Sequence, residues 1–154
     1  MSLFPSSLND PAGSTILLSV KPRFTDLVVT GEKRVEFRRT APAAEVGIIV
    51  VYASAPTSAI VAMVPVQQTV YTSIKKLWGL SRDLYGGLTR NGLRDYFADR
   101  DNGFTFLLGD VRVYPKPLRP DSIVHDFRAP QSFCYLSPAE IGRAVKLLSV
   151  QKRT

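Results

Sequence analysis

The stretch that decides the fold is LLSVKPRFTDLVVTGEKRVEFRR, residues 17–39. Its first residues complete an apolar run, residues 15–20, whose length suits a buried strand. Pro22 can occupy the first turn of a helix, because its missing N–H needs no partner there, and Gly31 can end that helix. Residues 33–39 then alternate apolar and charged side chains, which is typical of a strand with one apolar and one polar face. We therefore expect a strand, a short helix and a second strand in succession.

Two apolar runs follow this segment and predict the centre of a sheet. Residues 46–53, VGIIVVYA, and residues 58–66, SAIVAMVPV, are too continuously apolar for strands with an exposed face. A turn at residues 54–57 joins the two runs, which together predict a hairpin.

The second half of the chain predicts short helices and a further pair of strands. Residues 69–99 mix helical spacing of apolar side chains with several glycines, which favours two short helices and a loop. Residues 104–108 and 111–118 are expected to pair with each other across Gly109 and Asp110. Two prolines near its end place the later strand at a sheet edge.

A helix is expected near the C-terminal end of the chain. Ser137 can cap it, Pro138 suits its first turn, and Glu140 completes a capping box before an apolar face that starts at Ile141. Five or six strands that follow one another without long helices between them predict an α+β fold. We expect a small, mostly antiparallel sheet or β-barrel with short flanking helices, and not a doubly wound sheet.

Length and composition predict one cytoplasmic domain. The chain has 154 residues, within the range of roughly 100–200 residues that is typical of a single domain. We expect a flexible leader at residues 1–14, one domain over residues 15–150 and a C-terminal tail at residues 151–154. No apolar run approaches the length of about 20 residues that crosses a bilayer, and the first residues lack a signal-peptide pattern. A single cysteine and a single histidine argue against a zinc site, and no cofactor is predicted.

The chain is strongly basic. Its 20 Lys and Arg residues against 13 Asp and Glu residues give a formal net charge of +7. Such a balance favours polyanionic partners, nucleic acid first, through Coulomb attraction and counterion release. The alternative is that the excess charge only keeps the protein soluble. Six of the basic residues lie within residues 21–39, which makes the strand–helix–strand segment the candidate contact surface.

Four charged side chains of this segment are candidate binding residues. Lys21 follows the first strand, and Lys33, Glu36 and Arg38 lie on the second. We expect the cations to converge on one hollow, where a carboxylate among them has a lowered pKa and orients them. The alternative is a solvated strand face, with ion pairs that each contribute less than about 1 kcal/mol.

The same residues resemble a known family. Residues 17–39, followed by VVYASAP (50–56) and AIVAMV (59–64), are similar to the ASCH domain (activating signal cointegrator homology), a branch of the PUA-like superfamily. The family pattern starts with a strand whose last four positions are Ser, then Ile or Val, then Lys or Arg, then Pro (S-[IV]-[KR]-P). A helix follows, and after it the motif G-x-K-x-x-E-x-R. FRAPQSFCYL (127–136) resembles the P-Q-S-F segment of many prokaryotic members.

The resemblance implies a small β-barrel that binds RNA or a modified nucleotide in a basic cleft beside the G-x-K strand. Lys21, Lys33 and Arg38 would contact phosphate or sugar. Glu36 would hold these cations in place or accept a hydrogen bond from a base amino group. Gln131 and Ser132 would line the far wall.

Two other classes of function stay open, an enzyme on the same scaffold and a partner-binding module. Hydrolases of the superfamily that act on N4-acetylcytidine carry G-x-K-x-x-T-x-R, in which the lysine acts with the threonine and a distant glutamate. Gly31, Lys33 and Arg38 match that pattern, but Glu36 replaces the threonine and would keep the lysine protonated. A ribonuclease could instead use Tyr52 or Ser132 with Lys33 as its candidate catalytic residue. The third alternative is a transcription-linked module that binds a protein partner through its C-terminal helix.

For the single histidine, the single cysteine and four aromatic residues we expect mainly structural roles. His125 is expected to be structural or solvated, and Cys134 to be a small buried side chain. Four aromatic residues have the helical spacing of core residues, with base stacking as the alternative: Trp78, Tyr85, Tyr96 and Phe97.

Overall fold

The computed structural model describes residues 13–98 and 100–153. Seven strands, four α-helices and one 3-10 turn follow one another along this part of the chain. They are β1 (Ser14–Val20), α2 (Pro22–Val29), β2 (Val35–Arg38), β3 (Val46–Ala53), β4 (Ala59–Ser73), α3 (Ile74–Leu84), α4 (Arg90–Phe97), β5 (Asn102–Leu108), β6 (Arg112–Leu118), η1 (Pro120–Ser122), β7 (Phe133–Tyr135) and α5 (Pro138–Arg153).

The strands form one mixed sheet that bends in the middle of β4. Their order is β2-β5-β4-β3-β1-β7, and β6 pairs with β4 beside this path. β1 and β3 are parallel, and the other strand pairs in the described residues are antiparallel. A bulge between Val66 and Gln68 lets the first half of β4 pair with β3 and β6, and its second half with β5. The predicted α+β class is thus confirmed.

The sheet is not closed, so the predicted barrel is not confirmed. β2 and β7 are the two ends of the strand order, and among the described residues no backbone ladder joins them. β2 has only four residues, and its ladder is formed with β5. Side chains, described below, span the gap between β2 and β1 instead.

Local patterns predicted the strand–helix–strand segment, the hairpin and the terminal helix correctly. Pro22 starts α2, which ends before Gly31 at a φ of +81°, and β3 pairs with β4 as an antiparallel hairpin. At the start of α5 the Glu140 carboxylate accepts from the Ser137 N–H at 2.8 Å, and the Ser137 hydroxyl accepts from the Glu140 N–H at 3.2 Å. This arrangement is the capping box.

Two strand predictions were wrong because they depend on pairing across the sheet. β4 does not end near residue 66 but continues to Ser73, because residues 68–73, predicted to begin a helical region, pair with β5. The strands at 104–108 and 111–118 do not pair with each other: β5 pairs with β2 and β4, and β6 pairs with the first half of β4. The Gly109 N–H donates to the Pro65 carbonyl at 2.8 Å, so the chain continues along the same edge of β4, from β5 to β6, instead of turning back on itself.

The first strand and the last helix each extend past residues 15–150, the range expected for the domain. Ser14, expected in the leader, begins β1, and residues 1–12 lie outside the described residues. α5 includes residues 151–153, which were expected as a tail. No glycine or proline occurs after residue 142 to end the helix earlier.

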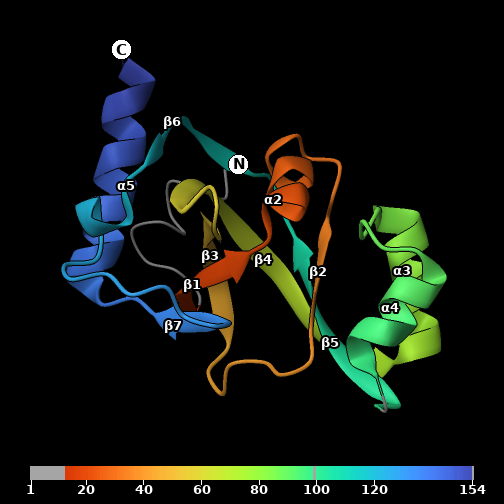
Figure 1. The fold of residues 1–154 in the computed structure, drawn as a ribbon. Helices are drawn as coiled ribbons and strands as arrows, with labels where there is room; N and C mark the ends of the chain where they lie inside the picture. Colours follow the sequence, from red (N-terminus) through yellow and green to blue (C-terminus); the bar gives the residue numbers. More distant parts are fainter. Residues whose placement is uncertain (1–12, 99, 154) are drawn as a thin grey trace.

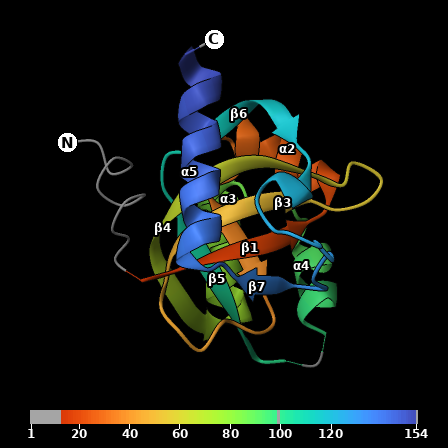
Figure 2. The same cartoon turned by 90° about the vertical axis from the view of Figure 1, so that its left-hand side faces the viewer.

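Three apolar clusters hold the layers together. The first lies between β1, β3 and α5 and includes Leu17, Val50 and Ala144. The second fills the concave side of the bent sheet beneath α2, with Leu18 and Phe106 among its members. The third joins β2 to α3 and α4. Figure 1 shows α5 on one flank of the sheet and the α3–α4 pair on the other, and Figure 2 shows α5 passing across β1 and β3. No helix within the described ranges is long and apolar enough to span a membrane.

Candidate nucleic-acid interface

The charged face of β2 is buried. Val35 and Phe37 point into the third cluster, toward α3 and α4, so strand alternation turns Glu36 to the opposite, concave side. There Glu36 lies beside Phe106 of β5 in the sheet register and is only 7% exposed, and Lys33 is 3% exposed. The alternative of a solvated strand face is therefore wrong, because α3 and α4 cover one face of this strand and Lys33 and Glu36 are buried on the other.

Glu36 holds two cations at once. Its Oε1 lies 3.0 Å from Lys33 Nζ, and its Oε2 lies 3.3 Å from Arg38 Nη2. Lys33 Nζ also donates to the Val35 carbonyl. Burial alone would raise the pKa of Glu36, but the charges and hydrogen bonds of Lys33 and Arg38 outweigh burial and hold the pKa below its ordinary value. The carboxylate is thus ionised and fixes the directions of both cations.

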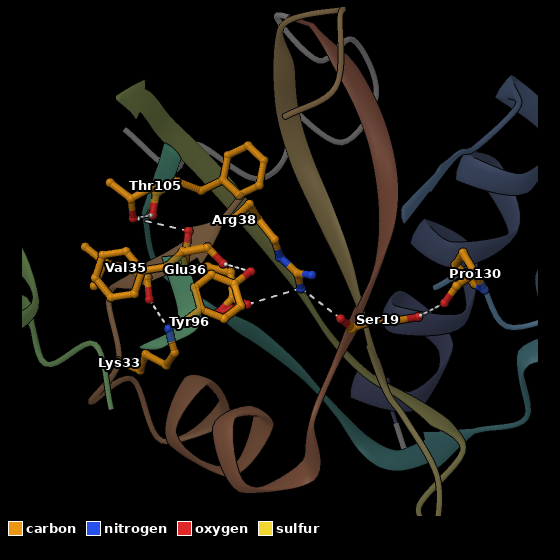
Figure 3. Close-up of polar contacts among 10 residues, drawn as sticks. Ser19, Lys33, Val35, Glu36, Arg38, Tyr96, Thr105 and Pro130 are labelled. Atoms are coloured by element: carbon orange, nitrogen blue, oxygen red, sulfur yellow. Dashed lines mark hydrogen bonds and ion pairs between the residues drawn. The ribbon is translucent and has the colours of Figure 1, made fainter. Parts of the chain in front are cut away.

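Arg38 carries this network across the gap in the sheet. Its Nη2 donates to the Ser19 carbonyl at 2.8 Å, and the Ser19 hydroxyl donates to the Pro130 carbonyl at 2.7 Å. The Ser19 N–H also donates to the Ser132 carbonyl at 2.8 Å. Figure 3 shows the chain of contacts from Lys33 through Glu36 and Arg38 to Ser19 and Pro130. β2, through Arg38, and the segment before β7 therefore both bind β1 at Ser19.

One donor of Arg38 remains without a partner. Its Nε is buried and makes no hydrogen bond in the described part of the chain, although the side chain as a whole keeps 13% of its surface exposed. A buried donor without an acceptor costs about 1–3 kcal/mol. The guanidinium is thus oriented by Glu36 and Ser19 but not fully satisfied by the protein.

Tyr52 and Ser132 lie on either side of Ser19. Tyr52 is the β3 partner of Ser19 in the parallel register, and Ser132 is joined to Ser19 by the backbone hydrogen bond. Tyr52 is buried, and its ring centroid lies 5.0 Å from that of Phe127. Ser132 is half-buried. Three hydroxyl-bearing residues therefore follow one another across β3, β1 and the start of β7.

The structure does not bring all predicted site residues into one hollow. Lys21 is exposed at the N-cap of α2 and takes no part in the network through its side chain. Gln131 is exposed beside Ser132. Lys33 lines a separate pocket of about 190 Å³, which lies between the end of α2 and the β5–β6 connection and includes Gly31 and Asp110. Lys21 does not line the pocket that contains Lys33. That the two cations converge on one hollow therefore stays a prediction.

The sequence missed an aromatic pair beside Arg38. Phe104 of β5 lies between Arg38 of β2 and Tyr71 of β4 in the sheet register. The Phe104 and Tyr71 rings lie 4.5 Å apart at 31°, and Tyr71 is 61% exposed. Tyr71 was overlooked because residues 69–99 were predicted to be mainly helical. Only the pairing of β4 with β5 shows that Arg38, Phe104 and Tyr71 are aligned across three strands.

The other notable side chains have mostly structural surroundings. Phe97 is buried in the third cluster, with Trp78 and Tyr96 packed against it, while Tyr85 is 51% exposed. Burial and the nearby Glu140 raise the pKa of the half-buried Cys134 thiol, and His125 is exposed. The described residues contain no group of three or more side chains able to hold a metal ion.

The lowered pKa of Glu36 predicts a loss of stability in acid. Because the pKa lies below its ordinary value of 4.5 in the folded state, the unfolded chain binds the proton more tightly. The stability that Glu36 contributes is present at neutral pH and is lost as the pH falls from about 4.5 through the folded pKa. Urea unfolding from pH 7 to pH 3 should show a steeper loss for wild type than for Glu36→Gln, which cannot titrate. Parallel stability curves for the two proteins would contradict this assignment.

Comparisons with known proteins agree with this geometry. The ASCH domain model matches residues 18–96. An ASCH domain-containing ribonuclease from Zymomonas mobilis is 29% identical over an alignment of 147 residues that covers 90% of this chain and 95% of the relative. The crystal structure of ASCH from Zymomonas mobilis has a TM-score of 0.79 at 28% identity, covering 87% of this chain and 95% of that one.

Two further crystal structures are single-residue variants of the Zymomonas mobilis protein. One replaces a tyrosine by phenylalanine and the other a serine by alanine. Both have TM-scores of 0.79 at 27% identity over 87% of this chain, and cover 98% and 96% of their own chains. Because the family model covers more than half of the 154 residues, this protein belongs to the ASCH domain family.

Proposed function

We propose that this protein binds single-stranded RNA at the meeting point of β1, β2 and the segment before β7, with Arg38 at the centre. The observation that carries the proposal is the state of the Arg38 guanidinium. Glu36 and the Ser19 carbonyl orient it, while the side chain keeps 13% of its surface exposed. A phosphate oxygen is the acceptor that a guanidinium binds best, because the bond is charge-assisted and can be bidentate.

The surroundings of Arg38 favour a nucleic acid over a simple anion. Tyr71 and Phe104 offer an aromatic surface in the same register row, and unpaired bases stack on such surfaces whatever their sequence. The net charge of +7 supplies long-range attraction for a phosphate chain. Lys21 and Gln131, both exposed, would extend the contact at its rim.

Ribonuclease activity is the second candidate, and the name of the Zymomonas mobilis relative favours it. Cleavage of RNA needs a cation for the charge that develops on the phosphate and a group that positions the attacking or leaving hydroxyl. Arg38 would supply the charge. The hydroxyls of Tyr52 and Ser132, a tyrosine and a serine beside Ser19, would supply the positioning.

Lys33 is a positioning residue in this proposal rather than a base. Its ammonium group lies 3.0 Å from the Glu36 carboxylate and donates to the Val35 carbonyl, so groups of the protein already hold it. The same contact weakens the N4-acetylcytidine hydrolase alternative, in which the lysine would have to act on the substrate. Glu36 stands where that alternative needs a threonine.

Tyr71→Ser tests the aromatic part of the site. Because the ring is 61% exposed, the loss of fold stability should be small, whereas the loss of stacking should weaken RNA binding by about 1–3 kcal/mol. Fluorescence anisotropy of a labelled oligoribonucleotide measures the affinity. Tyr85→Ser removes a tyrosine that is 51% exposed at the end of α3 and should leave the affinity unchanged. Equal affinities for both variants and wild type would remove Tyr71 from the site, and affinity that does not fall with salt would end the RNA proposal.

A further inference from the structure

A second basic pocket lies between α3, α4 and the start of β5. Its volume is about 360 Å³, larger than the pocket beside Lys33 at about 190 Å³. None of the residues of the Arg38 network lines it. The lining residues that bear on its chemistry are Lys75, Trp78, Arg90, Arg94, Arg100 and Asp101.

The charge around this pocket is poorly balanced. Among the residues that the structure describes, which leave out residue 99, four exposed cations line it with one carboxylate, that of Asp101. In the part of the chain that the structure describes, Lys75, Arg90 and Arg94 form no ion pair with an acid. Arg100 instead donates to the Arg39 carbonyl at 2.9 Å. Cations gathered in this way repel one another, and a polyanion that enters the pocket relieves the repulsion.

Trp78 gives the pocket an aromatic wall. It is half-buried, because the indole packs against the third apolar cluster while it also lines the pocket. An indole held from one side by a packed core is a rigid surface for a base, and Arg and Lys side chains nearby can take the phosphates on either side of that base.

The pocket lies close to the end of the proposed RNA site. Ser73 lines the pocket, and its pair with Asn102 is two residues beyond the Tyr71–Phe104 pair in the β4–β5 register. Arg39, which follows Arg38, places its guanidinium 5.0 Å from the centre of the Tyr96 ring on α4. Basic and aromatic side chains therefore continue from Arg38 toward the α3–α4 pair, and Figure 1 shows this helix pair beside β2 and β5.

We infer that the pocket between α3 and α4 is a second contact for the same RNA strand, with one base stacked on Trp78 and the adjoining phosphates bound by Arg90 and Arg94. This inference rests on the proposed function, since it assumes that RNA already binds at Arg38. It adds that strands long enough to pass the end of β4 and β5 bind more tightly than short ones.

Trp78 is the only tryptophan of the chain, so its fluorescence reports on this pocket alone. Wild-type protein is titrated with oligoribonucleotides of about 4 and about 12 nucleotides, lengths that bracket common single-strand sites. Both bind in the anisotropy assay, and only the longer one quenches Trp78. The Arg90→Ala/Arg94→Ala variant removes two phosphate contacts, so its slope of log affinity against log salt falls by about 1.4 for the longer strand. Its affinity for the shorter strand is unchanged.

The charge-matched control is Lys76→Ala/Arg82→Ala, which removes two exposed cations of α3 that do not line the pocket. It should bind the longer strand like wild type. If the longer strand binds without quenching and the two variants behave alike, the inference is overturned while the proposed function stands. If uridine monophosphate quenches Trp78 as strongly as the longer strand at equal concentration, the pocket is a nucleotide site and the strand path is overturned. Failure of both strands to bind would overturn the proposed function itself.

Discussion

Glu36→Gln should destabilise the folded protein by about 3–5 kcal/mol at neutral pH, the cost of breaking a buried ion pair from one side. The substitution keeps the shape of the side chain but leaves Lys33, which is 3% exposed, without a counterion. Arg38 loses the same partner. The free energy of unfolding in urea measures the effect.

Two variants show whether the loss comes from the ion pair. Glu32→Gln changes a neighbouring exposed glutamate and should stay within about 0.5 kcal/mol of wild type. Lys33→Met combined with Glu36→Gln removes both buried charges, so the double variant should be more stable than the sum of the two single losses predicts. Strict additivity would mean that Lys33 and Glu36 do not stabilise each other.

Arg38→Met should lower the affinity for single-stranded RNA by about 1.5–3 kcal/mol, the usual strength of hydrogen bonds to a charged group. The slope of log affinity against log salt should fall by about 0.7, since one phosphate contact is lost. Glu36 keeps its ion pair with Lys33 at 3.0 Å, so the variant should still fold. Anisotropy titrations at several salt concentrations give both quantities.

Arg38→Lys and Arg119→Met separate geometry from charge. The lysine variant keeps the charge but not the planar fork, so it should recover the salt slope without the full affinity. Arg119 is 86% exposed and pairs with Asp121 at 3.5 Å, and its replacement removes one charge away from the network. If Arg119→Met weakens binding as much as Arg38→Met, RNA is attracted by net charge alone and Arg38 is not the centre of the site.

Much of the candidate site could be predicted from residues 17–39, because its decisive signals are local. The alternation of residues 33–39 placed Glu36 and Arg38 on one side of a strand, and Glu36 does pair with Lys33 and Arg38. Lys21 was grouped with them because it is near in sequence, yet it is exposed at the N-cap of α2. Proximity along the chain did not decide which cations share a carboxylate.

Tyr71 and Phe104 show why the rest could not be predicted. They are 33 residues apart in the sequence and come into contact because β4 continues past its bulge and pairs with β5. Neither residue carries a local signal for this pairing. The same applies to β6, which pairs with the first half of β4 and not with the strand that precedes it.

By itself, the sequence determined which segments become strands and helices over most of the chain, since apolar period, caps and prolines act within a few residues. It also determined that the protein is basic and that Glu36 lies among cations. Only the tertiary structure decided that this charged face is buried, that Arg38 spans an open sheet, and that an aromatic pair lies beside it. The physical reason is that a strand pattern defines two faces, whereas the elements that cover each face, and the register that aligns neighbouring strands, come from contacts between residues far apart in the chain.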